Sequence, residues 1–401
     1  MKIVRGNSTQ IISKVARAQG HSNMKKNFSI LMVAMHLDYR IHGGLSRHAY
    51  ELCKALNRLG CQVFVSCVKN DALHINNKIE VSSFPSIAFL DFLSFNLNLP
   101  RKIRDYDIDV VHSQADRGFI FALMKNRPLV VTAHSSMKIG LRAVPRFLFR
   151  PSPYFRILTE KYTFMKADKI IAVSKSTSMA LQNDYGVSKE KIVCIPNAVD
   201  VEKFSPNLNG EIIRRKYEVN GPLLLCVARL EVGRYVEKLI PMVKAVKKEF
   251  PNIKLIIVGD GPSKQSLQRL CLRHRLTSSV TLTGSKGDRE LPYFYAAADL
   301  CVQPMVYTPA IKEFNVLEAM ACGKVLVYVD RMGLKNGDEI ISEGNPIAVS
   351  SDKNFVESII YLLQNEKKRK ELGMVARKAI MERFSWEKVA EKTIEVYESV
   401  V

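Results

Sequence analysis

The sequence predicts an α/β protein with two doubly wound parallel-sheet domains that face each other across a linker. Short apolar runs alternate with helix-length segments in both halves of the 401-residue chain, a pattern typical of parallel strands joined by helices. The polar stretch 207–221 separates the two series and predicts the interdomain linker. Hydrophobic residues make up 47% of the chain, which is enough to fill two cores.

The first half opens as a β–loop–α–β unit, with a buried strand at 28–35, an amphipathic helix over 45–60 and a second strand at 61–68. Between the first strand and the helix stand Gly43 and Gly44, at the edge where open α/β sheets bind ligands. Two glycines allow a backbone to approach a phosphate, although an ordinary turn uses them as well. The alternation continues with strands at 108–113, 128–135 and 169–174 and helices over 118–126 and 157–167.

His134 lies at the carboxyl end of the run 128–135 and is a candidate site residue at the crevice edge, with an exposed loop histidine as the alternative. Two segments, 83–104 and 138–169, mix apolar and basic residues. They are compatible with a surface that lies on an anionic membrane, and equally with core-facing helices whose charges are solvated.

The second half repeats the alternation, with strands at 222–230, 252–262, 279–285, 299–304 and 325–329 and helices over 236–250, 263–275 and 290–298. Arg229 and Arg234 flank the loop after its first strand, and Gly259 and Gly261 make a tight turn after the next. A helix begins near Asn315. Arginines, glycine turns and a helix N-terminus at one sheet edge predict a diphosphate site.

Glu318 lies three residues after Asn315, in what we expect to be the first turn of that helix. There it is placed to accept hydrogen bonds from ribose hydroxyls. The same spacing is that of a capping box, which is the structural alternative.

The net charge of +21 favours an anionic partner, either a phosphorylated substrate, an acidic lipid surface or a nucleic acid. The eight cysteines form no C-x-x-C pair and are expected to be reduced thiols of a cytoplasmic protein. Residues 1–27 are basic and lack the apolar core of a secretory signal, so we expect a flexible extension, a transit-like segment or translation upstream of Met24. The run KKRK at 367–370 is expected to be the solvated face of a helix.

From Phe28 onward the chain resembles the family-4 glycosyltransferases of the GT-B fold. In the first half the matching motifs are GGLSRH (43–48), TAH (132–134), IIAVSKS (170–176) and IPNAVDVEKFSP (195–206). In the second half they are VARLEVGR (227–234), VGDGP (258–262) and LEAMACGK (317–324). The resemblance implies two Rossmann-like domains facing a cleft, an acceptor-side domain at 28–205 and a donor domain at 206–384, with a C-terminal helix at 385–401 crossing back to the first.

The resemblance also implies a role for each matching residue. Gly44 would approach the donor phosphate, Arg229 and Arg234 would bind the diphosphate, Glu318 would hold the ribose and His134 would lie near the transferred sugar. Transfer with retention of anomeric configuration and without a metal or other cofactor is implied as well. The expected catalytic residues are His134, Glu313 and Glu318, and the expected donor-binding residues are Gly43, Gly44, Arg229, Arg234, Gly259, Gly261, Ser285, Asn315, Val316, Leu317 and Glu318.

Two positions depart from the family pattern. The family carries two glutamates eight positions apart, but Ala310 stands eight residues before Glu318. Glu313 takes the missing role if the loop is three residues shorter; otherwise the sugar-facing carboxylate is absent. The usual Lys-Gly pair is replaced by Arg234-Tyr235, which keeps the charge but not the shape of lysine.

The sequence therefore predicts a glycosyltransferase that moves a sugar from a nucleotide-diphosphate sugar to a glycan or lipid-linked acceptor, at the inner face of a membrane. Ala310 motivates an alternative, a catalytically idle relative that binds a nucleotide-sugar or a partner glycosyltransferase. A nucleotide-sugar epimerase of the same fold is a third hypothesis. A nucleic-acid partner is not expected, because the basic residues are spread over both halves and no recognition module is present.

Overall fold

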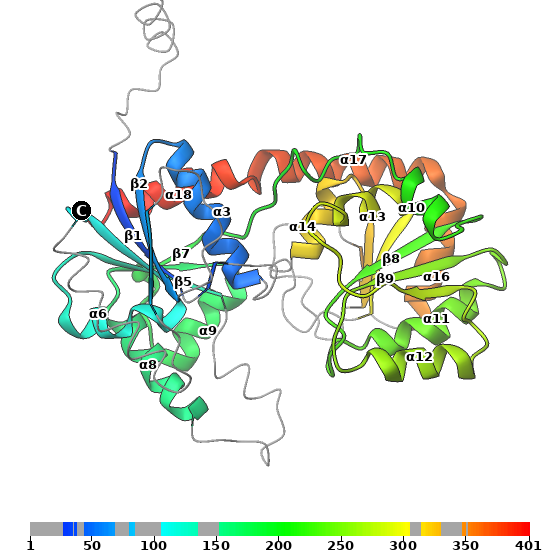
Figure 1. Cartoon of the computed structure of the whole chain (residues 1–401), viewed down its shortest axis with the longest axis horizontal. Coiled ribbons are helices and arrows are strands. Elements are labelled where there is room, and N and C mark those ends of the chain that lie inside the picture. Colours follow the sequence, from blue (N-terminus) through cyan, green and yellow to red (C-terminus); the bar gives the residue numbers. More distant parts are fainter. Residues whose placement is uncertain are drawn as a thin grey trace, which may run out of the picture.

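The computed structural model describes residues 27–34, 36–37, 44–68, 80–84, 106–134, 152–304, 314–329, 347–349 and 352–401. It contains two α/β domains that lie side by side, with the C-terminal helices running from one to the other (Figure 1). The doubly wound architecture expected from the sequence is thereby confirmed.

The N-terminal domain is built on a seven-stranded parallel sheet with the order β3-β2-β1-β4-β5-β6-β7. Its strands are β1 (Ser29–Val33), β2 (Gln62–Val68), β3 (Glu80–Phe84), β4 (Val110–Gln114), β5 (Leu129–Ala133), β6 (Lys169–Ala172) and β7 (Ile192–Cys194). Its helices are α3 (Gly44–Arg58), η2 (Ala115–Gly118), α6 (Phe119–Met124), α8 (Ser152–Lys166), α9 (Lys175–Tyr185) and η4 (Lys189–Lys191).

The apolar runs of this sheet are buried on both faces. In β1, Ile30 and Met32 pack in the core with α3 and the C-terminal helix, whereas Leu31 and Val33 pack in the core with α6 and α8. A strand that helices cover on both sides reads as a continuous apolar run, which is why it could be located from the sequence.

The C-terminal domain has a six-stranded parallel sheet with the order β10-β9-β8-β11-β12-β13. The strands are β8 (Leu223–Val227), β9 (Lys254–Val258), β10 (Val280–Leu282), β11 (Leu300–Gln303), β12 (Leu326–Val329) and β13 (Ile347–Val349). The helices are α10 (Glu211–Lys216), η5 (Val236–Lys238), α11 (Leu239–Val246), α12 (Lys264–Arg273), α13 (Leu291–Ala297), α14 (Phe314–Ala321) and α16 (Asp352–Gln364).

The last two helices, α17 (Glu366–Arg383) and α18 (Trp386–Glu398), connect the domains. In α17, Ala376 and Ile380 belong to the core of the C-terminal domain. Trp386 and Tyr397 of α18 belong to the core of the N-terminal domain, where α18 packs against α3. The helix breaks at Ser385, whose hydroxyl accepts a hydrogen bond from the Lys388 N–H (3.3 Å) and caps α18.

Each sheet reverses its strand order once, between β1 and β4 in the first domain and between β8 and β11 in the second. In open α/β sheets, ligands bind outside the carboxyl ends of the strands at such a switch point. A binding site is therefore expected among the residues of the loops that follow β1, β4, β8 and β11.

The sequence prediction was wrong about the linker. Residues 211–216 form the helix α10, with Ile213 buried against the C-terminal core. Arg214 donates hydrogen bonds to the carbonyl oxygens of Ala297 (2.8 Å) and Gly221 (2.6 Å), so a charged side chain fastens this helix to the domain. β3, α9, α16 and β13 were not predicted either, and residues 1–26, 85–105 and 135–151 lie outside the described residues.

All eight cysteines lie in the described part and are free; only Cys194 among them is exposed. Within the described ranges no helix has the length and apolarity that crossing a bilayer requires. No cluster of three or more histidine, cysteine or acidic side chains suited to a metal ion occurs in the same ranges.

Candidate functional site

The loop after β8 carries the two arginines and is held by the loop after β9. Gly259 has φ 147° and Gly261 has φ 153°, which side chains other than that of glycine rarely adopt. A Cβ atom at these positions would meet the carbonyl oxygens of Ala228 at 1.8 Å and Leu230 at 2.3 Å. The glycines thus let the two loops pack backbone against backbone, and the Leu230 N–H donates to the Asp260 carbonyl (3.0 Å).

Arg229 and Arg234 are loosely paired with one carboxylate. The Nε atom of Arg229 lies 3.9 Å from Glu231 Oε2, and that of Arg234 lies 3.5 Å from Glu231 Oε1. The Arg229 side chain is 79% exposed. Ion pairs of this length are weak, and the exposed Arg229 guanidinium is open to a stronger anion.

The helix α14 is fastened to two strand ends by Asn315. Its Nδ2 donates to the Val227 carbonyl oxygen (2.8 Å) at the end of β8 and to Gln303 Oε1 (3.2 Å) at the end of β11. These bonds fix the first turn of the helix at the switch point of the sheet.

Glu318 is enclosed between the two domains. Arg47 of α3 donates to Glu318 Oε1, and the Tyr295 hydroxyl donates to Oε2 (2.8 Å). The Glu318 side chain is 2% exposed, and the Arg47 guanidinium lies 4.8 Å from the Phe314 ring centroid. Burial, and then the Glu318 charge, raise the pKa of Tyr295 well above its usual value. Asn315 lies inside the described helix, which begins at Phe314, and the two Glu318 oxygens accept from Arg47 and Tyr295, so the capping-box alternative is wrong.

The N-terminal wall of the site is a cluster of rings and amides. His134 Nε2 is 2.8 Å from Gln114 Oε1, and the His134 and His48 ring centroids are 4.8 Å apart. His48 Nδ1 is 3.0 Å from Asn197 Oδ1, and its ring centroid is 5.4 Å from that of Trp386. Burial lowers the pKa of His48 to about 4, so its imidazole is neutral at pH 7.

These two walls enclose a cavity of about 310 Å³ between the domains. It is lined by Gly44, Leu45, His134, Val173 and Asn197 from the N-terminal domain and by Val227, Ala228, Arg229, Arg234, Phe314 and Asn315 from the C-terminal domain. Two guanidinium groups line the C-terminal side of the cavity, and a histidine lines its N-terminal side.

Comparison with known proteins agrees with this arrangement. Residues 42–203 match the family described as Glycosyltransferase Family 4, and residues 210–379 match Glycosyl transferases group 1. The chain belongs to the family-4 glycosyltransferases of the GT-B fold.

Relatives of this glycosyltransferase match over most of both chains. An uncharacterized glycosyltransferase of Methanocaldococcus jannaschii is 26% identical over 383 residues, which are 90% of this chain and 95% of the relative. The D-inositol 3-phosphate glycosyltransferase of Xylanimonas cellulosilytica is 23% identical over 88% of this chain and 91% of its own. The Anabaena protein HepE, solved in complex with UDP-glucose, superposes with a TM-score of 0.74 at 19% identity, over 93% of this chain and 100% of its own.

Five residues that the sequence predicted for the site of this glycosyltransferase meet at the cavity: Gly44, His134, Arg229, Arg234 and Asn315. They come from both domains, and their meeting is what the predicted cleft requires. Their individual roles stay predictions.

Other predicted residues are placed differently. Val316, Leu317 and Glu318 are buried, and none of them lines the cavity. Glu318 also lies just past the first turn of α14 and not within it, because the described helix begins at Phe314. Ser285 is exposed beside Gly284, whose carbonyl oxygen accepts from the Gly259 N–H (3.0 Å). Gly43, Ala310 and Glu313 lie outside the described residues.

The sequence analysis missed Arg47, Asn197 and Phe314. Arg47 and Asn197 stand inside motifs that carried the family resemblance, GGLSRH and IPNAVDVEKFSP, so the signal for them was present. Phe314 had no signal, because an aromatic residue before a helix is usually part of the core.

Proposed function

We propose that the glycosyltransferase moves a sugar, with retention of configuration, from a nucleotide-diphosphate sugar to a lipid-linked acceptor or a precursor of a cell-surface polysaccharide. One observation carries the proposal: Arg229 and Arg234 face the same cavity as His134 of the other domain. UDP-glucose is the first donor to test, because HepE binds it.

The two arginines suit the charge that develops during transfer. As the bond between the anomeric carbon and the diphosphate oxygen breaks, negative charge accumulates on the departing nucleoside diphosphate. Arg229 and Arg234 lie 3.9 and 3.5 Å from Glu231, which are long distances for ion pairs, so a diphosphate competes well with this carboxylate. We propose that these cations take the place of a divalent metal, and activity that disappears with EDTA would contradict this.

His134 lines the same cavity from the N-terminal domain. Its Nε2 lies 2.8 Å from Gln114 Oε1, and an amide oxygen only accepts, so Nε2 carries the hydrogen. This contact fixes the ring and its tautomer at the N-terminal wall of the cavity. We propose that His134 positions the transferred sugar from the side opposite the arginines.

Glu318 must change partners to hold a ribose. One of its oxygens is bound by Arg47 and the other by Tyr295. We propose that the ribose hydroxyls replace the Arg47 guanidinium, so that donor binding exchanges a contact between domains for a contact with the nucleotide.

The acceptor proposal rests on the surface of the N-terminal domain. Large apolar side chains are exposed on α6 and α8, which pack against each other: Leu123 (52%), Met124 (56%), Phe155 (53%), Leu158 (65%) and Met165 (48%). Lys125, Lys161 and Lys166 stand among them in the sequence. Apolar and basic side chains together suit the interface of an anionic membrane, so we propose a peripheral position on its inner face.

A catalytically idle relative is the second candidate, favoured by Ala310 and by the closed pairing of Glu318. It would bind a nucleotide-sugar without turnover. Glu313→Gln separates the two candidates. If Glu313 replaces the missing carboxylate, the variant loses discrimination among sugars; an idle protein shows no turnover with or without it.

Thermal unfolding with UDP-, GDP- and ADP-sugars and the bare nucleotides tests the proposed function. A ligand that binds the folded state raises the Tm according to its affinity. We expect one nucleotide to stabilise the protein, more strongly as its sugar conjugate, and Arg229→Gln to abolish the shift. Arg273→Gln, at an exposed position on α12, is the matched control. No shift with any nucleotide would refute the proposal.

A further inference from the structure

A second polar cluster lies at the switch point of the N-terminal sheet, in the turn after β4. Ala115 has φ 55°, a left-handed conformation that is strained for any residue except glycine. Ser113 holds the turn, because its Oγ accepts from the Gly118 N–H (2.8 Å) and donates to the Ala115 carbonyl (2.9 Å). A Cβ atom at Gly118 would lie 3.1 Å from Ser113 Cβ. This rigid turn places Asp116 and Arg117.

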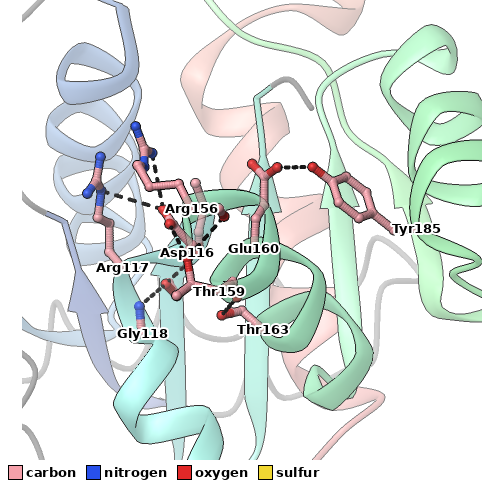
Figure 2. Close-up of polar contacts among 10 residues, drawn as sticks. Asp116, Arg117, Gly118, Arg156, Thr159, Glu160, Thr163 and Tyr185 are labelled. Atoms are coloured by element: carbon pink, nitrogen blue, oxygen red, sulfur yellow. Dashed lines mark hydrogen bonds and ion pairs between the residues drawn. The ribbon is translucent and has the colours of Figure 1, made fainter. Parts of the chain in front are cut away.

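Asp116 is fully buried and holds two guanidinium groups at a distance. Its Oδ2 accepts from the Thr159 hydroxyl (3.0 Å), whereas its Oδ1 lies 3.4 Å from Arg156 Nη2 and 3.9 Å from Arg117 Nε. Figure 2 shows both guanidinium groups on the same side of the carboxylate. Strong ion pairs of this type are about 2.7–2.9 Å long. The Asp116 carboxylate therefore lies near both guanidinium groups but forms a short ion pair with neither.

The two arginines retain donors that no described residue satisfies. The Nε atoms of Arg117 and Arg156 are buried and have no hydrogen-bond partner within the described ranges. The side chains are nevertheless 17% and 39% exposed, so an anion from solution can reach them. The nearby Glu160 carboxylate accepts from the Tyr185 hydroxyl, and Figure 2 shows it turned toward that tyrosine.

The charges and burial around Arg117 also favour the binding of an anion. Burial is the main cause that lowers the pKa of Arg117 below its usual value, and the charge of Arg156 acts in the same direction against those of Asp116 and Glu160. A buried cation beside a second cation is stabilised by any added negative charge.

The cluster is connected to the donor cavity. Gln114, the residue before the strained turn, contacts His134 at 2.8 Å, and His134 lines the cavity. Because β4 borders the switch point, an anion bound by Arg117 and Arg156 lies at the carboxyl edge of the N-terminal sheet, the edge at which His134 follows β5.

We propose that Arg117 and Arg156 form a binding site for a phosphate group of the acceptor. The group is a phosphomonoester of a sugar or polyol, or the phosphodiester of a lipid headgroup. Two guanidinium forks match phosphate oxygens, and Asp116 with Thr159 orients them. The inference rests on the proposed glycosyl transfer, since it names the chemistry of the acceptor for that reaction.

Inorganic phosphate is the first probe, titrated against the full chain with UDP at saturation so that the donor site is blocked. We expect phosphate to raise the Tm further, and Arg156→Lys and Arg117→Gln each to weaken phosphate binding about tenfold. The shift caused by UDP alone should stay unchanged in both variants. Arg127→Gln is the control, because Arg127 is 46% exposed and lies 3.9 Å from Asp107 in the same domain.

A second arm distinguishes the two sources of phosphate. Sedimentation with phosphatidylcholine vesicles that contain one part in five of phosphatidylglycerol tests the lipid headgroup, and glycerol 3-phosphate tests the soluble ester. Binding to the vesicles that Arg117→Gln and Arg156→Lys reduce identifies a lipid; binding of the soluble ester alone identifies a free phosphate. Phosphate affinity equal in wild type and both variants overturns the inference. A missing UDP shift in wild type overturns the proposed function instead.

Discussion

Acidification from pH 7 to pH 5 should destabilise the N-terminal domain through two buried histidines. Burial lowers the pKa of His48 to about 4 and that of His112 to about 3, below the usual 6.5. His112 bonds through Nδ1 to the Tyr397 hydroxyl (2.6 Å) and through Nε2 to Thr132 Oγ1 (2.7 Å). Both imidazoles are therefore neutral in the folded protein and gain a proton only on unfolding.

The direction follows from which state binds protons. Between the folded and the unfolded pKa the unfolded chain holds more protons, so stability is complete above the unfolded value and is lost as the pH falls toward the folded one. At pH 5 each histidine contributes a loss of about 2 kcal/mol relative to pH 7, and the two together lose about 4 kcal/mol. That is a large share of the stability of a typical domain.

Trp386 supplies the assay. It is the only tryptophan, it packs in the N-terminal core, and its ring centroid is 5.4 Å from that of His48. Urea unfolding followed by its fluorescence at both pH values gives the change in the free energy of unfolding. We expect His48→Gln and His112→Gln each to remove about half of the pH dependence. His274→Gln, in the other domain, is the control. A wild-type difference below about 1 kcal/mol, or a double variant that keeps the full dependence, would refute the reasoning.

Three further outcomes follow from the donor side of the site. Arg229→Ala should lower kcat/KM by at least about 30-fold, because it removes roughly 2 kcal/mol of stabilisation of the departing diphosphate; turnover equal to that of Arg273→Ala would contradict this. Gly259→Ala should lower both the Tm and the nucleotide affinity, since its Cβ meets the backbone that carries Arg229, and calorimetry with UDP measures both. Arg47→Met should lower the Tm, because Glu318 is left buried without its cation. The same variant should bind UDP several-fold more strongly, because the ribose hydroxyls no longer have to replace the Arg47 guanidinium on Glu318. Weaker UDP binding would show that Arg47 holds the donor itself.

The elements of the fold could be predicted from the sequence where their burial produces a local pattern of apolar residues. Strands such as β1 are apolar throughout because helices cover both faces. α10 was taken for a linker because its EIIRRK sequence is mostly polar, and its stability comes from the bonds of Arg214 to distant carbonyl groups. α9 has only a weak apolar periodicity, and its signals were the Ser174 cap and the left-handed Gly186.

The site was predictable to the extent that it lies at strand ends. His134 and Arg229 follow strands within two residues and Gly44 begins the helix after β1, and carboxyl ends of parallel strands meet at one edge of a sheet. The pairing of Arg47 with Glu318 joins residues 271 positions apart and could not be predicted from the helical pattern of either segment. Whether a carboxylate is open to a ribose depends on that partner.

The first residue of the returning helix connects both walls of the cavity. The Trp386 ring centroid lies 5.4 Å from that of His48 and 6.5 Å from that of Phe314, with which the ring is stacked. The His48 ring in turn packs against that of His134, and the Arg47 guanidinium lies over the Phe314 ring. A ring in contact with both walls resists any change in their separation, because packed side chains interdigitate closely. The C-terminal helix therefore does more than cover the N-terminal sheet: through Trp386 it packs against His48 of the N-terminal domain and Phe314 of the C-terminal domain.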